Sequence, residues 1–394
     1  MIVFIYPGQG SQEAGMGAPW INHPSWELVT EASDISGIDV KRLLIDAQSD
    51  ELKDTRNSQL ATFVLSMVTL DAVERLGVDA AGHAGHSLGE YSALTASGAL
   101  DFNDSVKLVC ERSSAMADAI LDSPGSMSAV IGLEEEVIEE ICLNSQEEVW
   151  VANYNAPNQV VIAGEKSALQ IVAKTIKSSG AKRVIPLEVA GAFHTPLMSS
   201  ARERLAAAVD TVEIRSPEGV VVANVDATAH SNPDTWRALL NAQLCSPVKW
   251  RQTMATLSDD GFTTFVELGP GKVLNGLTKR CLPEMQRMSI NNPDDLDSLL
   301  FALAVTTSEK EKVTHHEGEH LFATDRLVVS PNAGIFKPVT QIEIGKQVAT
   351  GTLLGTINGI EVRSPFAGEL LGWLAINEER VTASQPIAWL RATN

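Results

Sequence analysis

The arrangement of hydrophobic positions in the first part of the chain predicts an α/β fold. Residues 2–6 form a continuous apolar run that ends in the sequence PGQG, as expected for a buried strand followed by a loop. Hydrophobic side chains then recur at helical spacing and predict a helix over residues 58–75. The positions that carry this spacing are Leu60, Phe63, Val64, Met67 and Val68. A second short strand is expected to turn into a helix at residues 86–87.

A change of pattern between residues 124 and 189 predicts an inserted subdomain. Helical and strand-like segments follow one another there in the order β-α-β-β-α-β, which is typical of a ferredoxin-like fold. Beyond the insertion, residues 198–212 predict another helix, and short strands return the chain to the larger unit. We therefore expect a large α/β subdomain made of residues 1–123 and 190–305.

Residues 306–320 predict a linker, because they lack apolar periodicity and are rich in charged residues and histidine. His315, His316 and His320 fall in this segment. No cysteine or aspartate completes a set of metal ligands around them, so we expect no metal site.

The last segment, residues 321–394, contains an internal repeat. The sequence VVSPNAG at 328–334 recurs as EVRSPFAG at 361–368, which pairs Ser330 with Ser364. Two similar halves made of short strands predict a small all-β domain, built as a flattened two-fold barrel or sandwich.

Composition and charge restrict the possible partners. A chain of 394 residues with 44% hydrophobic and 20% charged residues is expected to fold into two or more globular units. Its formal net charge of −20 repels nucleic acid and anionic membranes, so neither is an expected partner. The four cysteines form no C-x-x-C pair, and neither an export signal nor a membrane span is recognisable, which predicts a cytoplasmic protein.

The sequence GHSLG at 85–89 fits the pattern G-x-S-x-G, in which a serine occupies a sharp turn between a strand and a helix. The turn exposes the Ser87 hydroxyl and brings the Leu88 backbone N–H to the start of a helix, where it can stabilise a developing negative charge. A serine hydroxyl needs a base in order to act as a nucleophile. His194, in AGAFHTPLM, is our candidate, although a lone histidine there can equally cap or pack the following helix.

Five motifs in a fixed order make a more specific match. They are PGQGSQ (7–12), GHSLGEYSAL (85–94), NAPNQVVIAG (155–164), AFHTPLM (192–198) and ELGPGKVLNGLTKR (267–280). Over about residues 1–300 the chain thereby resembles the malonyl-CoA:acyl-carrier-protein transacylases. This resemblance implies an α/β-hydrolase-like core with an inserted ferredoxin-like subdomain.

The resemblance also implies roles for individual residues. Ser87 becomes the acylated serine and His194 its base, while the backbone N–H groups of Gln9 and Leu88 form the oxyanion hole. The family orients its histidine through a main-chain carbonyl instead of a carboxylate. In this sequence we expect that carbonyl at about Asp260.

Selection of the acyl group is implied by further residues. Arg112, in VCERSSAM, aligns with the family arginine that pairs with the free carboxylate of malonate, which a planar guanidinium can bind through two parallel hydrogen bonds. Phe193 resembles the aromatic residue of malonyl-selective polyketide synthase domains and is expected to disfavour methylmalonate. Met116, Gln59 and His86 are further candidates for the same pocket.

The implied reaction moves malonyl from malonyl-CoA to Ser87 and then to the phosphopantetheine thiol of an acyl carrier protein, in ping-pong fashion. Fatty acid biosynthesis is the expected pathway, and no cofactor is expected beyond the coenzyme A thioester as substrate. An acidic carrier needs local positive charge, for which the candidates are Lys279, Arg280, Lys182 and Arg183. Two alternatives remain open: a serine hydrolase or thioesterase, and an inactive scaffold that acts through its C-terminal module.

Residues 321–394 resemble biotinyl or lipoyl attachment domains, in which the modified lysine stands at the tip of the hairpin between the two halves. Here Asn358-Gly359 predicts a tight two-residue type I′ turn at that place. No lysine lies between Lys346 and the C-terminus. We therefore expect neither biotin nor lipoate, and instead a structural module or one that docks another protein.

Overall fold

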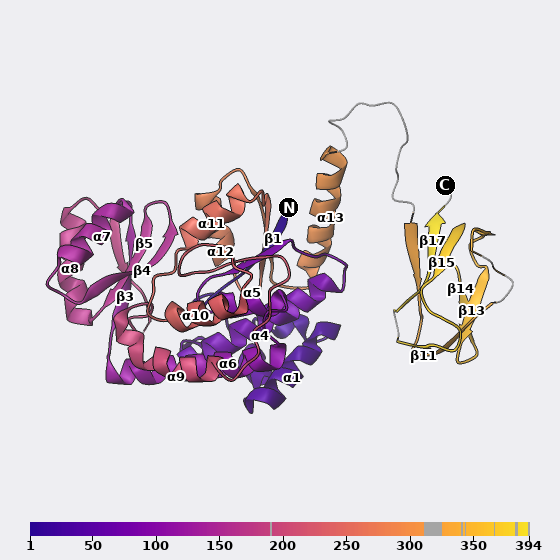
Figure 1. Ribbon diagram of the computed structural model, residues 1–394, viewed down its shortest axis with the longest axis horizontal. Coiled ribbons are helices and arrows are strands. Elements are labelled where there is room, and N and C mark those ends of the chain that lie inside the picture. Colours follow the sequence, from indigo (N-terminus) through magenta and orange to yellow (C-terminus); the bar gives the residue numbers. More distant parts are fainter. Residues whose placement is uncertain are drawn as a thin grey trace. The chain divides into compact units, whose positions relative to one another are not determined.

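The computed structural model describes residues 1–189, 191–310, 325–339, 342, 344–365, 367–382 and 385–392 (Figure 1). The chain divides into two compact units, Met1–Glu309 and Lys310–Asn394. The first unit is mixed α/β and the second contains only strands among its described residues beyond helix α13.

A parallel sheet organises the first unit. Its strands are β1 (Ile2–Tyr6), β2 (Gly82–Gly85), β7 (Val220–Val222), β8 (Thr264–Leu268) and β9 (Gln286–Ile290). They lie in the order β7-β2-β1-β8-β9, and every neighbouring pair is parallel. Because parallel strands end at the same edge of a sheet, the loop after β1 and the turn after β2 lie side by side.

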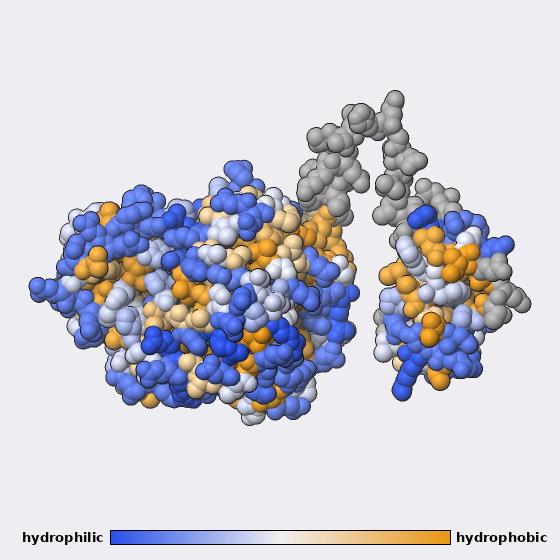
Figure 2. Space-filling model, viewed as in Figure 1, coloured by the Kyte–Doolittle hydropathy of each residue, from blue (hydrophilic) through white to orange (hydrophobic). Residues whose placement is uncertain are grey.

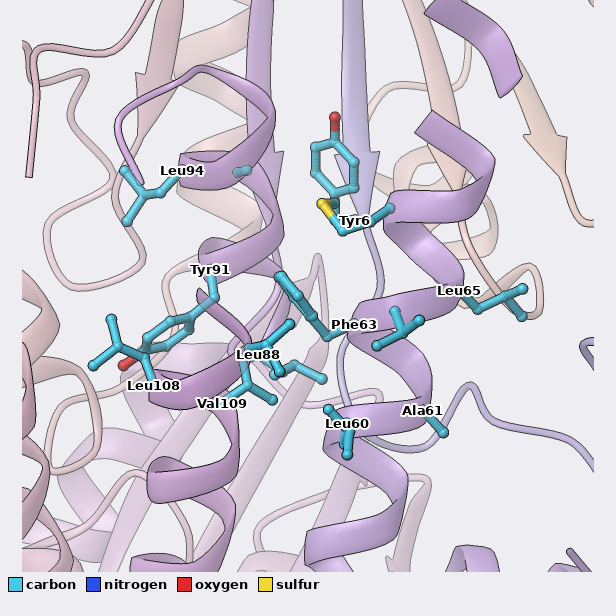
Figure 3. Packing of buried hydrophobic residues seen from close by; sticks show 14 of the residues in the cluster. Tyr6, Leu60, Ala61, Phe63, Leu65, Leu88, Tyr91, Leu94, Leu108 and Val109 are labelled. Atoms are coloured by element: carbon cyan, nitrogen blue, oxygen red, sulfur yellow. The ribbon is translucent and has the colours of Figure 1, made fainter. Parts of the chain in front are cut away.

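Helices cover this sheet. Their bounds are α1 (Glu27–Ser36), α2 (Val40–Ile45), α3 (Ser49–Leu52), α4 (Thr55–Glu74), α5 (Gly89–Ala96), α6 (Phe102–Asp122), α9 (Ser199–Val209), α10 (Pro233–Gln243), α11 (Trp250–Asp259), α12 (Val273–Cys281) and α13 (Asp294–Lys310). Helix α4 contains the predicted helical positions and is buried on nearly all sides, including small polar residues such as Ser58 and Thr62. Phe63 of α4 packs with Leu88, Tyr91 and Val109 against α5 and α6 (Figure 3).

Residues 124–189 form a second, antiparallel sheet. Its elements are β3 (Ser126–Ile131), α7 (Glu135–Asn144), β4 (Val149–Ala156), β5 (Gln159–Gly164), α8 (Lys166–Ser178) and β6 (Arg183–Pro186), with strand order β4-β5-β3-β6. Part of this sheet packs with α7 and α8 in a core of its own, whereas Ala129 and Val161 belong to the main hydrophobic core. Strand β4 is joined to the larger subdomain by two backbone hydrogen bonds of 2.9 Å, between Tyr154 and Val248 and between Val248 and Ala152. These bonds join the middle of β4 to the segment that leads into α11.

Helix α13 corrects the expected linker boundary. The helix extends to Lys310 and so includes the first five residues of the segment 306–320. A formed helix extends by one residue at little cost, whereas starting one is unfavourable, so a short polar stretch can continue it without apolar periodicity. His315, His316 and His320 lie outside the described residues.

The second unit has two sheets with the same internal order. Its strands are β10 (Asp325–Val329), β11 (Gly334–Pro338), β12 (Gln347–Val348), β13 (Leu353–Ile357), β14 (Ile360–Arg363), β15 (Gly368–Trp373), β16 (Arg380–Val381) and β17 (Pro386–Ala392). The described residues form the orders β10-β17-β15-β12 and β14-β13-β11-β16. The sequence repeat pairs strands β10, β11, β12 and β13 with β14, β15, β16 and β17, in that order. Replacing each strand of the first order by its counterpart gives the second order. Over the described residues the sequence repeat therefore corresponds to a two-fold repeat of the strand topology, with Ser330 and Ser364 both buried.

The hairpin between the two halves is as tight as the sequence predicts. Ile357 pairs directly with Ile360, and the two residues between them have φ values of 51° at Asn358 and 84° at Gly359. Positive φ at both central positions is the geometry of a type I′ turn.

Hydrophilic residues cover most of the visible surface of the α/β unit (Figure 2). Within the described residues, the helices are too short or too polar to cross a membrane. This agrees with the strongly acidic composition.

Candidate active site

Ser87 occupies the sharp turn between β2 and α5. Its φ of 53° lies in the left-handed region, which strains a residue that carries a Cβ. The flanking glycines are required by close approach of the backbone. A Cβ on Gly85 would lie 1.8 Å from the carbonyl oxygen of Gly89, and a Cβ on Gly89 would lie 2.1 Å from that of Tyr6.

The Ser87 hydroxyl contacts the predicted base. Oγ of Ser87 lies 2.8 Å from Nε2 of His194, and Nδ1 of His194 lies 3.0 Å from the main-chain carbonyl oxygen of Gln243. A carbonyl can only accept, so Nδ1 carries the proton and Nε2 is free to accept the serine proton. His194 also has a positive φ, of 61°.

The prediction that the main-chain carbonyl of Asp260 orients His194 was wrong, because the carbonyl of Gln243 does so. Gln243 is the last residue of α10, and the last carbonyls of a helix have no partner within the helix. The helix end is also the negative pole of its dipole, which stabilises a positively charged imidazole. Asp260 instead follows the end of α11.

His194 is neutral at neutral pH. Burial and, to a smaller extent, the positive charge of Arg112 together lower its pKa to about 3, although the hydrogen bond to the Gln243 carbonyl partly opposes them. The imidazole is thus in the state that can accept a proton.

Arg112 of α6 points its guanidinium at the serine. Its side chain is only 1% exposed, and one terminal nitrogen donates to Oγ of Ser87 at 3.0 Å and to Oε1 of Gln243 at 3.0 Å. The other terminal nitrogen donates to Oε1 of Gln59 at 2.6 Å. Among the described residues, Nε of Arg112 has no hydrogen-bond partner. A buried cation beside the nucleophile is suited to bind an anionic group.

A cavity of about 180 Å³ opens in front of these groups. Of the predicted substrate-binding residues, Arg112, Met116, Phe193 and His86 line it. Gln59 does not line it, but donates to the sulfur of Met116 at 3.3 Å in addition to holding Arg112. Four of the five predicted substrate-binding residues thus line one cavity, and the fifth, Gln59, contacts two of them from behind.

The two predicted oxyanion residues lie at the ends of neighbouring strands. Gln9 lines the cavity in the loop after β1, and its side chain turns away to donate to Oγ1 of Thr55 at 3.4 Å. Leu88 precedes α5, and its side chain is fully buried in the core. Leu88 itself does not line the cavity, so the roles of the Gln9 and Leu88 backbone N–H groups in the oxyanion hole remain predictions.

Known proteins match the whole α/β unit. The family model described as acyl transferase domain matches residues 3–293. The chain belongs to the acyl transferase family. The malonyl CoA-acyl carrier protein transacylase of Haemophilus influenzae is 40% identical over 296 residues, which cover 73% of this chain and 94% of the relative. That of Bacillus subtilis is 36% identical over 315 residues, covering 79% and 98%.

Solved structures of relatives have the same fold as this acyl transferase. An acyl carrier protein S-malonyltransferase from Vibrio cholerae superposes with a TM-score of 0.73 at 37% identity and covers 76% of this chain and 99% of its own. A malonyl-transacylase in complex with its holo type II PKS acyl-carrier protein superposes with a TM-score of 0.74 at 35% identity, covering 76% and 99%.

Two polar residues that sequence reasoning missed hold the strained turn of the acyl transferase. The Ser87 N–H donates to Oδ1 of Asn224 at 2.7 Å, and Nδ2 of Asn224 donates to the Gly85 carbonyl at 2.7 Å. Nε2 of Gln243 donates to the Ser87 carbonyl at 2.9 Å. Asn224 and Gln243 lie 137 and 156 positions from Ser87 and belong to none of the five motifs, so no local pattern indicated them.

His86 is held by the inserted subdomain of the acyl transferase. Its Nε2 lies 2.9 Å from Oδ1 of Asn155, and its ring centroid lies 5.6 Å from that of Trp250. Burial lowers the pKa of His86. Burial thus favours the neutral imidazole, and the residue lines the cavity.

Only two of the four basic residues expected to dock an acyl carrier protein lie at the same surface hollow. Lys182 and Arg280 line one surface hollow of about 340 Å³, where Arg280 also donates to the side chain of Gln159. Lys279 and Arg183 are exposed but do not line this hollow.

Proposed function

We propose that the α/β unit transfers malonyl from malonyl-CoA to the phosphopantetheine thiol of an acyl carrier protein and so supplies fatty acid biosynthesis. The observation that carries this proposal is the buried guanidinium of Arg112, which lies 3.0 Å from Oγ of Ser87. A cation at that distance from the nucleophile favours an acyl group that ends in a carboxylate.

In the first half-reaction, Oγ of Ser87 attacks the thioester carbonyl while Nε2 of His194 takes the hydroxyl proton. The backbone N–H groups of Gln9 and Leu88 stabilise the negative charge on the carbonyl oxygen. The carbon–sulfur bond then breaks, and the coenzyme A thiolate leaves with the proton from His194. The product is a malonyl ester of Ser87.

In the second half-reaction, His194 takes the proton of the carrier thiol, and the sulfur attacks the ester carbonyl. The carbon–oxygen bond breaks, and Ser87 recovers its proton from His194. Both half-reactions use one base in the same position, because a thioester stands on one side of each step and the serine ester on the other.

Selectivity follows from the walls of the cavity. Pairing between Arg112 and the malonate carboxylate rejects acetyl groups, which leave the cation unpaired. Phe193 and Met116 limit the space beside His194 and disfavour methylmalonate by about 1–3 kcal/mol, the effect of one methyl group in an apolar pocket. His86 packs against the acyl group.

The carrier protein is proposed to dock at the hollow between Lys182 and Arg280, with Lys279 and Arg183 adding positive charge nearby. The C-terminal unit is proposed to be a lipoyl-like barrel sandwich without an attached cofactor, and to dock another protein. The tight Asn358-Gly359 turn and the absence of a lysine at the tip support this. For the α/β unit we propose a hydrolase-like core with a ferredoxin-like insertion, working in the cytoplasm.

Labelled malonyl-CoA tests the proposal. Mass spectrometry is expected to find a malonyl ester on the Ser87 peptide, absent in Ser87→Ala and strongly reduced in His194→Ala. Addition of holo carrier protein should then move the label to the carrier. Label released as free malonate, with none on the carrier, would establish a hydrolase instead; no ester in the wild type would indicate an inactive scaffold.

A further inference from the structure

Glu90 is a buried carboxylate that the proposed reaction leaves without a role. It is the second residue of α5, and its side chain is 1% exposed. Oε1 accepts the main-chain N–H of Asn224 at 2.7 Å, and Oε2 accepts Nε2 of Gln243 at 2.5 Å. A carboxylate is costly to bury, and burial raises the pKa of Glu90 to about 7. Two hydrogen bonds and the positive pole of α5 offset part of that cost.

The bond from Glu90 fixes which way the Gln243 amide points. Oε2 of Glu90 accepts from Nε2 of Gln243, so the NH₂ end of Gln243 faces Glu90. The same NH₂ donates to the Ser87 carbonyl at 2.9 Å, and the oxygen end accepts from Arg112 at 3.0 Å. A reversed amide would place oxygen against two acceptors and NH₂ against the guanidinium.

The orientation of Gln243 in turn fixes Arg112. Oε1 of Gln243 and Oε1 of Gln59 accept from the two terminal nitrogens of the guanidinium. These two acceptors hold the plane that directs one terminal nitrogen at Oγ of Ser87. If Gln243 presents its NH₂ instead, the guanidinium loses one anchor and meets a donor.

We infer that Glu90 is a positioning residue for malonyl selectivity, acting through the side chain of Gln243 to hold Arg112 towards the acyl group on Ser87. The inference rests on the proposed function, because it concerns the malonate carboxylate. It assigns Glu90 no contact with substrate.

A double-mutant cycle tests this chain of contacts. The measured quantity is the rate of Ser87 acylation by malonyl-CoA divided by the rate with acetyl-CoA, followed by mass spectrometry. Glu90→Gln can keep only one of the two accepted bonds, and Gln243→Met removes the amide while the main-chain carbonyl to His194 remains. Each single substitution is expected to lower the ratio about tenfold, the loss for one hydrogen bond to a charged group.

In the Gln243→Met background, Glu90→Gln is expected to change the ratio by less than about twofold, because the contact that transmits its effect is gone. Equal falls in both backgrounds, or an unchanged ratio in Glu90→Gln, would overturn the inference. Thermal unfolding of each variant shows whether it is folded. Should Glu90→Gln not fold, Glu90→Asp, which keeps the charge but shortens the reach, is measured in both backgrounds in its place.

Glu267→Gln is the matched control. Glu267 is a fully buried carboxylate that accepts the main-chain N–H groups of Leu274 and Asn275 at 3.0 and 2.8 Å, and within the described residues none of its hydrogen bonds goes to Gln243 or Arg112. Glu267→Gln is expected to keep the malonyl-to-acetyl ratio, so a fall as large as that of Glu90→Gln would mark a general structural effect and overturn the inference.

Wild type and Arg112→Ala distinguish failure of the proposed function from failure of the inference about Glu90. If wild type does not prefer malonyl, the proposed function fails; if Arg112→Ala abolishes the preference while Glu90→Gln retains it, the inference alone fails.

Discussion

The main-chain carbonyl of Gln243 lies 3.0 Å from Nδ1 of His194, so the base is oriented by the end of a helix. A carboxylate in that position would carry a full negative charge and would raise the basicity of the imidazole more strongly. The helix end supplies about half a charge. His194 is therefore a weak base that depends on the close contact with Ser87, at 2.8 Å.

Arg112→Lys is predicted to lose malonyl selectivity although the charge is kept. A lysine ammonium is a single point of contact and cannot span Gln59, Gln243 and Ser87 as the guanidinium does. We expect the acylation rate with malonyl-CoA to fall by about one to two orders of magnitude, the loss of one or two charged hydrogen bonds, with a smaller change for acetyl-CoA. Quenched time courses of Ser87 acylation with malonyl-CoA and with acetyl-CoA measure both rates. If the lysine variant keeps the wild-type ratio of malonyl to acetyl acylation rates, the two parallel hydrogen bonds of the guanidinium do not explain the selectivity.

The acid limb of the pH profile is predicted to lie well below the usual range for histidine. The folded pKa of His194, about 3, is lower than its ordinary 6.5, so the neutral base persists as pH falls below 6.5. The rate constant for acylation by acetyl-CoA at low substrate concentration reports the free enzyme without the malonyl selectivity that depends on Glu90, and it is expected to hold down to at least about pH 5. In Arg112→Ala the neighbouring positive charge is gone, and the limb should move to higher pH. An acid limb near 6.5 in the wild type contradicts the geometry.

Stability of the α/β unit is predicted to fall between pH 6 and pH 8 because of Glu267. Burial raises the pKa of this carboxyl from 4.5 to about 7. Between these two values the folded protein binds more protons than the unfolded chain, so the stabilisation is complete below pH 4.5 and is lost as pH rises through 7. The loss between pH 6 and pH 8 is about 1 kcal/mol. Denaturant unfolding of wild type and Glu267→Gln at both pH values measures it, and equal pH dependence of the two proteins would argue against this assignment.

Gly359→Val is predicted to destabilise the β unit by about 1–2 kcal/mol, the cost of a left-handed conformation for a residue with a Cβ. Gly359 has a φ of 84°. Gly372→Ala is the control, because no heavy atom lies within 4 Å of a Cβ built there and its φ is not in the strained region. Calorimetry is expected to show a lower transition for the β unit only in the valine variant, with acylation of Ser87 unchanged. A fall in the transition of the α/β unit would show that the two units do not unfold independently.

Local chemistry made part of the site predictable. The bend at Ser87 needs small neighbours, and the sequence around it shows them directly in Gly85 and Gly89. The motifs likewise indicated His194 and Arg112, and the structure brings both to the serine. The tight turn at Asn358 was also readable, since few residues tolerate positive φ.

What could not be predicted depends on tertiary contacts. Gln243 ends an ordinary amphipathic helix, and nothing in its local sequence shows that this end meets His194; Asp260 was expected in its place. Asn224 contacts Ser87 only because β7 lies beside β2. The expected start of the linker at residue 306 was also wrong, because helix α13 continues through polar sequence to Lys310.

The two-fold β unit has a consequence for its synthesis. Each of its two sheets, over the described residues, takes two strands from the first half of the repeat and two from the second. A ribosome that has released only residues up to the Asn358-Gly359 hairpin has therefore produced half of each sheet and no complete one. Neither half can serve as a template for the other until both have emerged, so this unit is expected to acquire its structure in a single late event.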